Sequence, residues 1–259
     1  MLALDKLTVG YAAPRGAVLD AATLGVEPGA FICILGRNGA GKSTLMRTIA
    51  GLQPPLGGHA LLEGEDIAAM RAATRARRVA VVLTERSFSP GLKVEDVVSL
   101  GRQPFTSWQG HLSADDHRIA SDALAQAGAT PFAGRYFDDL SDGERQRVMI
   151  ARAIAQTARL MILDEITAFL DLPGRVEIMA LLRHHARATG AIVLLSSHDL
   201  DLSLQLADQV WLVAEGSVET GSADALVASG AIARAFDTPD VAFSSERRRF
   251  ELVQAGRPE

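Results

Sequence analysis

The sequence contains few cysteines and few lysines. Cys33 is the only cysteine, so no disulfide framework can form within the chain. It lies in the apolar run 31–35, and we interpret it as a small buried residue rather than a reactive thiol. The only lysines are Lys6, Lys42 and Lys93, so the basic character comes mostly from arginine. A lysine at position 42, inside a glycine-rich loop, is therefore a candidate functional residue.

Long apolar runs and an excess of positive charge are also missing. No apolar stretch approaches the roughly 18 residues that span a bilayer. The first residues lack the basic start and apolar run of a signal peptide. We therefore expect a soluble, cytoplasmic protein that reaches a membrane only through a partner. The net charge of −5 argues against a nucleic-acid partner, because nucleic-acid-binding domains are typically basic.

Short apolar runs recur along the 259 residues, 48% of which are hydrophobic. These runs are 31–35, 79–83, 160–163, 192–195 and 210–213. They are too short for helices and indicate strands that are buried on both faces. Helical stretches separate several of them, which predicts an α/β fold with a mainly parallel sheet.

Two regions depart from this alternation. Residues 1–30 and 57–66 predict an antiparallel β flap on the main sheet. Residues 87–155 predict a helical insertion, with helices at about 93–101, 113–128 and 142–157. Alternating residues after position 236 indicate a small terminal hairpin.

A glycine-rich loop follows the first of the buried runs. It matches the phosphate-loop pattern G-x-x-x-x-G-K-[ST], with a strand before it and a helix after it. The residues are Gly36, Arg37, Asn38, Gly39, Ala40, Gly41, Lys42, Ser43 and Thr44. The glycines bring backbone N–H groups close to phosphate oxygens, and the helix dipole favours the same anion. Lys42 is expected to bind the β- and γ-phosphates, and the Ser43 hydroxyl is expected to bind Mg²⁺.

Polar residues also follow two other buried strands. Asp164 and Glu165 come directly after 160–163, at the edge where open α/β sheets bind ligands. Asp164 is expected to hold Mg²⁺ through water, and Glu165 to polarise the water that attacks the γ-phosphate. His198 follows 192–195 at the same edge, and we expect it to hydrogen-bond the γ-phosphate.

The segment 140–148 predicts the start of a helix. Ser141 and Glu144 form an S-x-x-E capping box ahead of an apolar helical face. A capping box alone accounts for these two residues, but it does not explain their position before an acidic strand end in a phosphate-loop protein.

Together these motifs resemble the ABC ATPase family over nearly the whole chain. The segment 140–144 is similar to the family's L-S-G-G-Q signature, which binds the ATP held by the other subunit of a head-to-tail dimer. The resemblance therefore implies ATP hydrolysis with Mg²⁺ in a homodimer, with Ser141, Gly143 and Glu144 at the partner's nucleotide.

Three other residues take their expected roles from the same resemblance. Tyr11 is similar to the aromatic residue on which adenine stacks, and Asp171 to the aspartate that couples the two ATP sites. His198 is similar to the family's switch histidine, which gives it a catalytic role beside Glu165 and Lys42.

Three departures from the family pattern stand out. Glu85 occupies the place of a glutamine that reaches Mg²⁺ and reports to the transmembrane subunits. A carboxylate is also a hard oxygen ligand, so we expect Glu85 to contact the metal. In the signature, Asp142 replaces a glycine and Glu144 a glutamine. Ile166 replaces a proline, and we expect only a local packing effect from it.

Several stretches resemble the subfamily that imports ferric siderophores, haem and cobalamin. These are 82–86, 100–104 with 112–113, and 140–148. The resemblance implies a peripheral subunit on the cytoplasmic face of the inner membrane, where 100–113 meets one of two transmembrane permease subunits. A substrate-binding protein is an indirect partner.

The same resemblance implies one ABC ATPase domain over 1–259. Residues 1–86 and 156–235 are expected to form the nucleotide-binding core with its flap, and 87–155 the helical signature subdomain. Residues 236–259 are a C-terminal extension.

Two other classes of protein remain open. A soluble, non-transport ABC ATPase that acts as an assembly scaffold should be stable without a membrane partner, so co-purification separates it from a transporter subunit. A DNA-repair type should carry a long coiled-coil insertion, which is absent from the sequence. A kinase is disfavoured by the signature and His198, and a GTPase by the lack of Asn-Lys-x-Asp.

Overall fold

The computed structural model describes residues 1–14, 16–83, 91–107 and 109–253. The chain divides into two compact units. The first comprises Met1–Val26, Phe31–Ala68 and Ser196–Glu259, and the second comprises Glu27–Ala30 and Ala69–Leu195.

The first unit contains the antiparallel β flap that the sequence predicts. Its strands are β1 (Leu2–Tyr11), β2 (Gly16–Val26), β4 (Gly57–Leu62) and β5 (Glu65–Asp66), in the order β2-β1-β4-β5. In β1, Leu2 and Leu4 are buried before Lys6, and Leu7 and Val9 after it. An irregularity in the pairing lies between Leu4 and Leu7, where Lys6 has a φ of 47°. This bulge keeps both apolar pairs buried, although a strict two-residue alternation would expose one of them.

The strand before the phosphate loop also lies in the first unit. This strand, β3 (Phe31–Leu35), pairs in parallel with β9 (Gln209–Ala214), which continues into an antiparallel hairpin with β10 (Ser217–Gly221). All five residues of β3 are buried, as predicted for a strand covered on both faces. Cys33 is fully buried in this strand, as predicted, and its burial raises the pKa of the thiol to about 12.

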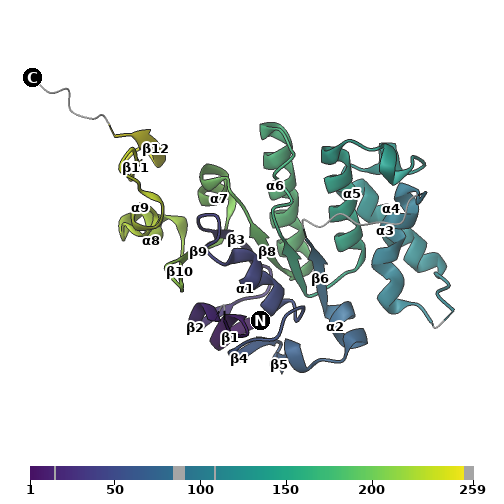
Figure 1. Ribbon diagram of the computed structural model, residues 1–259. Coiled ribbons are helices and arrows are strands. Elements are labelled where there is room, and N and C mark those ends of the chain that lie inside the picture. Colours follow the sequence, from purple (N-terminus) through teal and green to yellow (C-terminus); the bar gives the residue numbers. More distant parts are fainter. Residues whose placement is uncertain (15, 84–90, 108, 254–259) are drawn as a thin grey trace, which may run out of the picture. The chain divides into compact units, whose positions relative to one another are not determined.

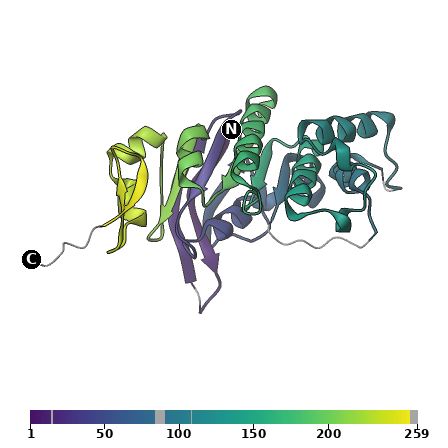
Figure 2. The ribbon, with the colours of Figure 1, turned by 90° about the horizontal axis from the view of Figure 1, so that it is seen from above.

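The remaining helices of the first unit are short. They are α1 (Lys42–Ile49), α7 (Leu200–Leu206), α8 (Ala223–Ala228) and α9 (Ala231–Phe236). The predicted terminal hairpin is present as β11 (Val241–Ser244) and β12 (Arg249–Leu252). The Phe250 ring packs edge-on against Phe243 and Phe236, with centroids 5.4 and 5.9 Å away. This aromatic cluster holds the hairpin beside α9 (Figure 2).

The second unit contains the other three predicted parallel strands. They are β6 (Val79–Val82), β7 (Leu160–Leu163) and β8 (Ile192–Ser196), in the order β8-β7-β6, and only the last residue of β8 belongs to the first unit. Helices α2 (Ala72–Arg78) and α6 (Leu172–Thr189) belong to the same unit.

The predicted helical insertion forms the rest of the second unit. Its helices α3 (Val94–Ser99), α4 (Ala114–Gln126) and α5 (Asp142–Ala155) lie together in Figure 1. The helix expected at 93–101 is shorter than predicted, because the chain continues from Leu100 as the 3₁₀ helix η2 (Leu100–Phe105). Pro104 lies inside η2 and cannot donate an α-helical hydrogen bond.

Among the described residues, no helix combines the length and the apolar character needed to cross a membrane.

Candidate functional site

Packing requires glycine at two positions of the phosphate loop. The loop leaves β3 at Gly36 and enters α1 after Gly41, which has a φ of 104°. A Cβ atom at Gly36 would lie 2.4 Å from the Val213 carbonyl oxygen, and one at Gly41 would lie 2.4 Å from Cγ1 of Val18. Any other side chain at these positions would push the loop away from its neighbours. The strand–loop–helix arrangement that the sequence predicts is therefore confirmed.

The Lys42 side chain is folded back into this loop. Its Nζ donates hydrogen bonds to the carbonyl oxygens of Gly36, at 2.8 Å, and Arg37, at 3.3 Å. Lys42 is only 5% exposed, so its positive charge is concentrated inside the loop. Ser43 follows it, half-buried, in the first turn of α1. The loop therefore holds a cation and a hydroxyl beside a helix N-terminus, which suits an anion such as phosphate.

Tyr11 lies at the same loop. Its hydroxyl is 3.2 Å from Oγ1 of Thr44, and the tyrosine is 39% exposed. Thr44 is buried in the first turn of α1. The predicted adenine-stacking residue and the predicted phosphate-binding residues are thus brought together within one unit, although their sequence positions are far apart.

His198 is held close to β3 in the first unit. The Ser197 N–H donates to the Ile34 carbonyl oxygen at 3.2 Å, which ties the segment before His198 to the strand that enters the phosphate loop. Asp199 caps α7 by accepting a hydrogen bond from the Leu202 N–H at 3.1 Å. The exposed His198 is therefore held between a strand end and a helix cap, as its sequence position predicts.

Asp164 and Glu165 follow β7 in the second unit, as predicted. The Asp164 N–H donates to the Val82 carbonyl oxygen at 2.9 Å, and the Asp164 residue is 5% exposed. Glu165 is half-buried and has a φ of 52°, a left-handed conformation that is uncommon for a residue with a side chain. Ile166, which replaces the family's proline and follows the pair in the sequence, is buried. A left-handed backbone like that of Glu165 often accompanies functional residues.

The capping box at the start of α5 is confirmed. The Ser141 hydroxyl accepts from the Glu144 N–H, and the Glu144 carboxylate accepts from the Ser141 N–H at 2.8 Å and from its hydroxyl at 2.9 Å. Arg135 pairs with the other carboxylate oxygen at 3.0 Å. Bonds from the Ser141 backbone and hydroxyl, helped by Arg135, lower the pKa of Glu144. Glu144 is therefore ionised at neutral pH.

The segment that carries Asp171 packs beside this signature. A Cβ atom at Gly143 would lie 3.3 Å from Cδ2 of Leu170, so the two segments approach closely. The exposed Asp171 caps α6 by accepting a hydrogen bond from the Gly174 N–H at 3.0 Å. Helix capping is a structural role for this aspartate, in addition to the coupling role that the resemblance implies.

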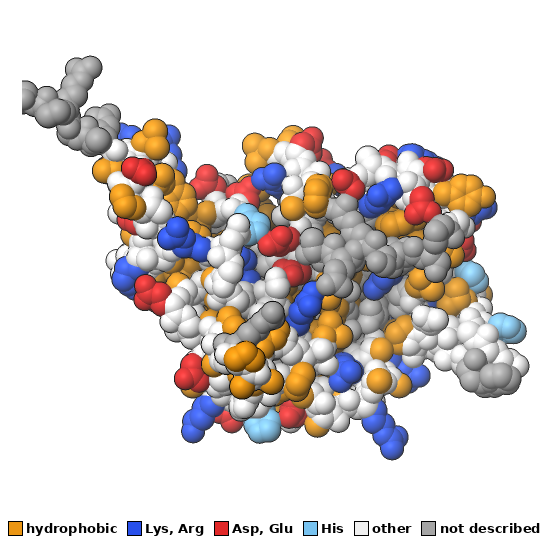
Figure 3. Space-filling model, in the orientation of Figure 1, with side chains coloured by type: hydrophobic (Ala, Val, Ile, Leu, Met, Phe, Trp, Pro, Cys, Tyr) orange, Lys and Arg blue, Asp and Glu red, His pale blue; other side chains and the backbone are white. Residues whose placement is uncertain are grey.

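The predicted site residues fall into two groups. The first unit contains the phosphate loop, Tyr11 and His198, and the second contains the acidic pair, the signature and Asp171. Glu85 lies outside the described residues. Among the residues that are described, no three His, Cys, Asp or Glu side chains are grouped as ligands for a metal ion. On the face shown in Figure 3, acidic and basic side chains are interspersed.

Residues 19–168 of the chain match the model of the ABC transporter family. The chain is 38% identical over 205 residues to the achromobactin transport ATP-binding protein of Dickeya dadantii. This match covers 79% of this chain and 76% of that protein. It is 38% identical over 238 residues to the hemin import ATP-binding protein of Streptomyces coelicolor, over 91% and 84% of the two chains. An inward-facing metal-chelate type ABC transporter superposes with a TM-score of 0.79 at 25% identity, over 96% of this chain and 94% of that chain.

Proposed function

Because the chain belongs to the ABC transporter family, we propose that it is the ATP-hydrolysing subunit of an importer for an iron chelate, haem or cobalamin. The observation that carries the ATPase assignment is the phosphate loop, in which Lys42 is held between β3 and the N-terminus of α1. The cargo rests on the named relatives and on the stretches that resemble this importer subfamily.

In this proposal Lys42 exchanges its bonds to Gly36 and Arg37 for bonds to the β- and γ-phosphates of ATP. The N–H groups of the loop and the first turn of α1 bind the same phosphates. Tyr11 stacks on adenine from its place beside Thr44. Glu165 accepts a proton from the attacking water, and His198 hydrogen-bonds the γ-phosphate.

The available donors suit Mg²⁺. The Ser43 hydroxyl and the Asp164 carboxylate are hard oxygen ligands, which this cation prefers. Glu85 is the third proposed ligand. Bound Mg²⁺ would offset the negative charge of the β- and γ-phosphates.

We further propose that two copies of the chain close on two ATP molecules. Ser141, Gly143 and Glu144 of one copy contact the nucleotide held by the phosphate loop of the other, and Asp171 couples the two sites. In this arrangement, 1–86 and 156–235 form the nucleotide-binding core, 87–155 the signature subdomain and 236–259 an extension of a single ABC ATPase domain.

The carboxylate of Glu144 opposes this closure, because it places a negative charge beside the partner's triphosphate. We expect Glu144→Gln to lower the ATP concentration needed for dimer formation by about threefold or more. The reason is that the repulsion between two unit charges a few ångströms apart in water is about 1 kcal/mol. An amide oxygen can still accept the Ser141 hydrogen bonds, so the helix cap is retained. Analytical ultracentrifugation of the variant, in a hydrolysis-deficient Glu165→Gln background, measures the effect.

Glu177→Gln is the matched control for this change. Glu177 pairs with Arg147 at 2.7 Å on the same unit and is 64% exposed at its side chain. Removing its charge should leave the ATP dependence of the dimer unchanged. The variant that carries both Glu144→Gln and Glu165→Gln is compared with Glu165→Gln alone. Weaker dimerisation of the double variant would show that the Glu144 carboxylate contributes attraction instead of repulsion.

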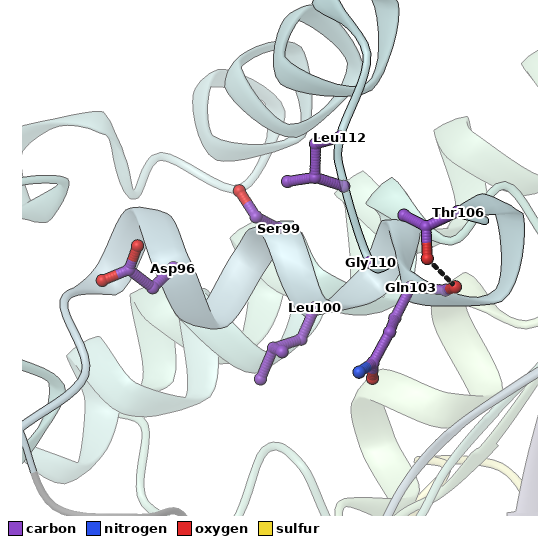
Figure 4. Close-up of a pocket in the computed structure, with 7 residues that line it drawn as sticks. All are labelled: Asp96, Ser99, Leu100, Gln103, Thr106, Gly110 and Leu112. Carbon is purple, nitrogen blue, oxygen red and sulfur yellow. Dashed lines mark hydrogen bonds between the residues drawn. The ribbon is translucent and has the colours of Figure 1, made fainter. Parts of the chain in front are cut away.

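The permease is proposed to dock over 100–113, where the second unit has a surface pocket of about 220 Å³. Its lining residues come from α3, from η2 and from the loop that follows η2; they are Asp96, Ser99, Leu100, Gln103, Thr106, Gly110 and Leu112 (Figure 4). Leu100 is 38% exposed. The mixture of apolar and polar side chains suits a short helix or loop of the permease.

We place the working protein on the cytoplasmic face of the inner membrane, bound to two permease subunits that receive cargo from a substrate-binding protein. Deletion of the gene tests the proposal through growth on haem, a ferric siderophore or vitamin B12 as the limiting source. Growth should fail on one of these sources and be restored by the native gene, but not by Lys42→Ala. Unimpaired growth and uptake on all three would reject the proposed cargo class.

A further inference from the structure

Arg102 of η2 is a buried arginine with three separate partners. Its Nε donates to Oδ1 of Asp116 at 2.9 Å, and its Nη1 donates to the Ala155 carbonyl oxygen at 2.9 Å and to Oγ1 of Thr157 at 3.0 Å. The residue is only 6% exposed. One side chain therefore joins η2 to the start of α4 and to the end of α5.

The aromatic ring of Phe105 adds a further contact. The Arg102 guanidinium carbon lies 4.0 Å from the centroid of this ring, within the range of a cation–π interaction. Arg77, which lies in α2, donates a hydrogen bond from its Nε to the carbonyl oxygen of Pro104 in η2, at 2.7 Å. Helix η2 therefore also contacts α2.

The backbone of η2 also lies directly against α5. A Cβ atom at Gly101 would lie 2.3 Å from the Arg152 carbonyl oxygen and 3.1 Å from Cβ of Ala155. Only glycine permits this approach. Two independent observations, the Gly101 backbone contact and the bonds of Arg102, therefore make η2 and the last turn of α5 a single packed joint.

Asp116 is the negatively charged partner of Arg102 in this joint. Its other carboxylate oxygen accepts from the Ser113 hydroxyl at 2.6 Å and from the Ser113 N–H at 3.0 Å. These bonds, together with Arg102, lower the pKa of Asp116 to about 2, so the pair stays ionised at physiological pH. Because both side chains are largely shielded from water, neither charge can leave the other without a large penalty.

We propose that Arg102 is a positioning residue that transmits permease docking to the signature helix. Helix η2 supplies Leu100 and Gln103 of the docking pocket, and it is joined at Arg102 to α5, which begins at the signature. A displacement of η2 therefore moves α5 with it. Arg102 also bonds Thr157, in the segment that leads into β7 and its acidic end. This inference rests on the proposed function of the pocket.

The test compares the ATPase rate of the isolated chain with its rate when assembled with its permease in lipid vesicles. In Arg102→Met the isolated chain should keep the native rate. The stimulation by the permease should fall by about fivefold or more, the lower end of a typical coupling between sites. Asp116→Asn should have the same effect, because an asparagine oxygen can still accept the Ser113 hydrogen bonds of the capping box but carries no charge for Arg102.

Arg118→Met is the matched control, because Arg118 lies on α4 and forms exposed ion pairs with Asp115, at 2.6 Å, and Asp122, at 3.1 Å. It should keep both the isolated rate and the stimulation. Thermal unfolding of each variant verifies folding, and Asp116→Asn decides the test if Arg102→Met does not fold.

Native stimulation in a folded Arg102→Met or Asp116→Asn chain would overturn the inference. A fall of the isolated and stimulated rates by the same factor would also overturn it, because the joint would then serve stability alone. If the permease does not raise the ATPase rate of the native chain, the proposed function itself is rejected. This outcome is measured on the native chain, without any variant.

Discussion

Replacing Glu165 by glutamine is expected to slow ATP hydrolysis by about 10²- to 10⁴-fold, the usual contribution of a general base, while ATP still binds. The amide has nearly the shape of the carboxylate but cannot accept a proton from the attacking water. Glu165 is half-buried, follows Asp164 after the end of β7, and has a left-handed backbone conformation. The variant should therefore retain the ATP-bound dimer and accumulate it.

Steady-state ATPase assays and nucleotide titration measure this change. Glu215→Gln is the matched control, because Glu215 is also a glutamate in a left-handed conformation, with a φ of 49°, but it lies in the exposed β9–β10 turn. The control should hydrolyse ATP at the native rate. An unchanged rate in Glu165→Gln would exclude Glu165 as the base.

Lys42→Ala is expected to weaken ATP binding by about 10- to 100-fold or more, because a hydrogen bond to a charged group typically contributes 1.5–3 kcal/mol. The lysine is 5% exposed, and its Nζ lies over the carbonyl oxygens of the phosphate loop. No other lysine lies in the loop, so its charge cannot be replaced locally by another ammonium group.

Isothermal titration with ATP measures this loss of affinity. Lys93→Ala is the control, because Lys93 is an exposed lysine near Glu95, at 3.9 Å, and belongs to the second unit. Its removal should leave the dissociation constant unchanged. Tight ATP binding by Lys42→Ala would contradict the assignment of the phosphate loop.

The sequence predicted those parts of the fold whose cause is local. The runs at 31–35 and 160–163 are β3 and β7, because a strand covered on both faces is a short continuous apolar run. The capping box of Ser141 and Glu144 was predictable for the same reason, since its partners are three residues apart. Strand β10 was missed, because Ser217–Gly221 is partly exposed and lacks a buried apolar run.

The contacts that organise the candidate site could not be predicted in this way. Arg135 reaches Glu144, and Arg102 reaches Ala155, across loops with no local pattern. The Tyr11 hydroxyl meets Thr44 only because β1 folds over the phosphate loop. The sequence placed the phosphate loop, the acidic pair and His198 correctly at strand ends, while the chemical role of each residue stays a prediction.

Mixing two inactive variants tests most directly whether two copies of the chain share each ATP site. Lys42→Ala removes the phosphate loop's cation, and Ser141→Arg blocks the signature, so each variant alone should be inactive. In a mixed dimer, the intact loop of one copy faces the intact signature of the other. Measured ATPase activity should therefore reappear when the two are combined. A mixture that hydrolyses no more ATP than the two variants apart would contradict the shared site.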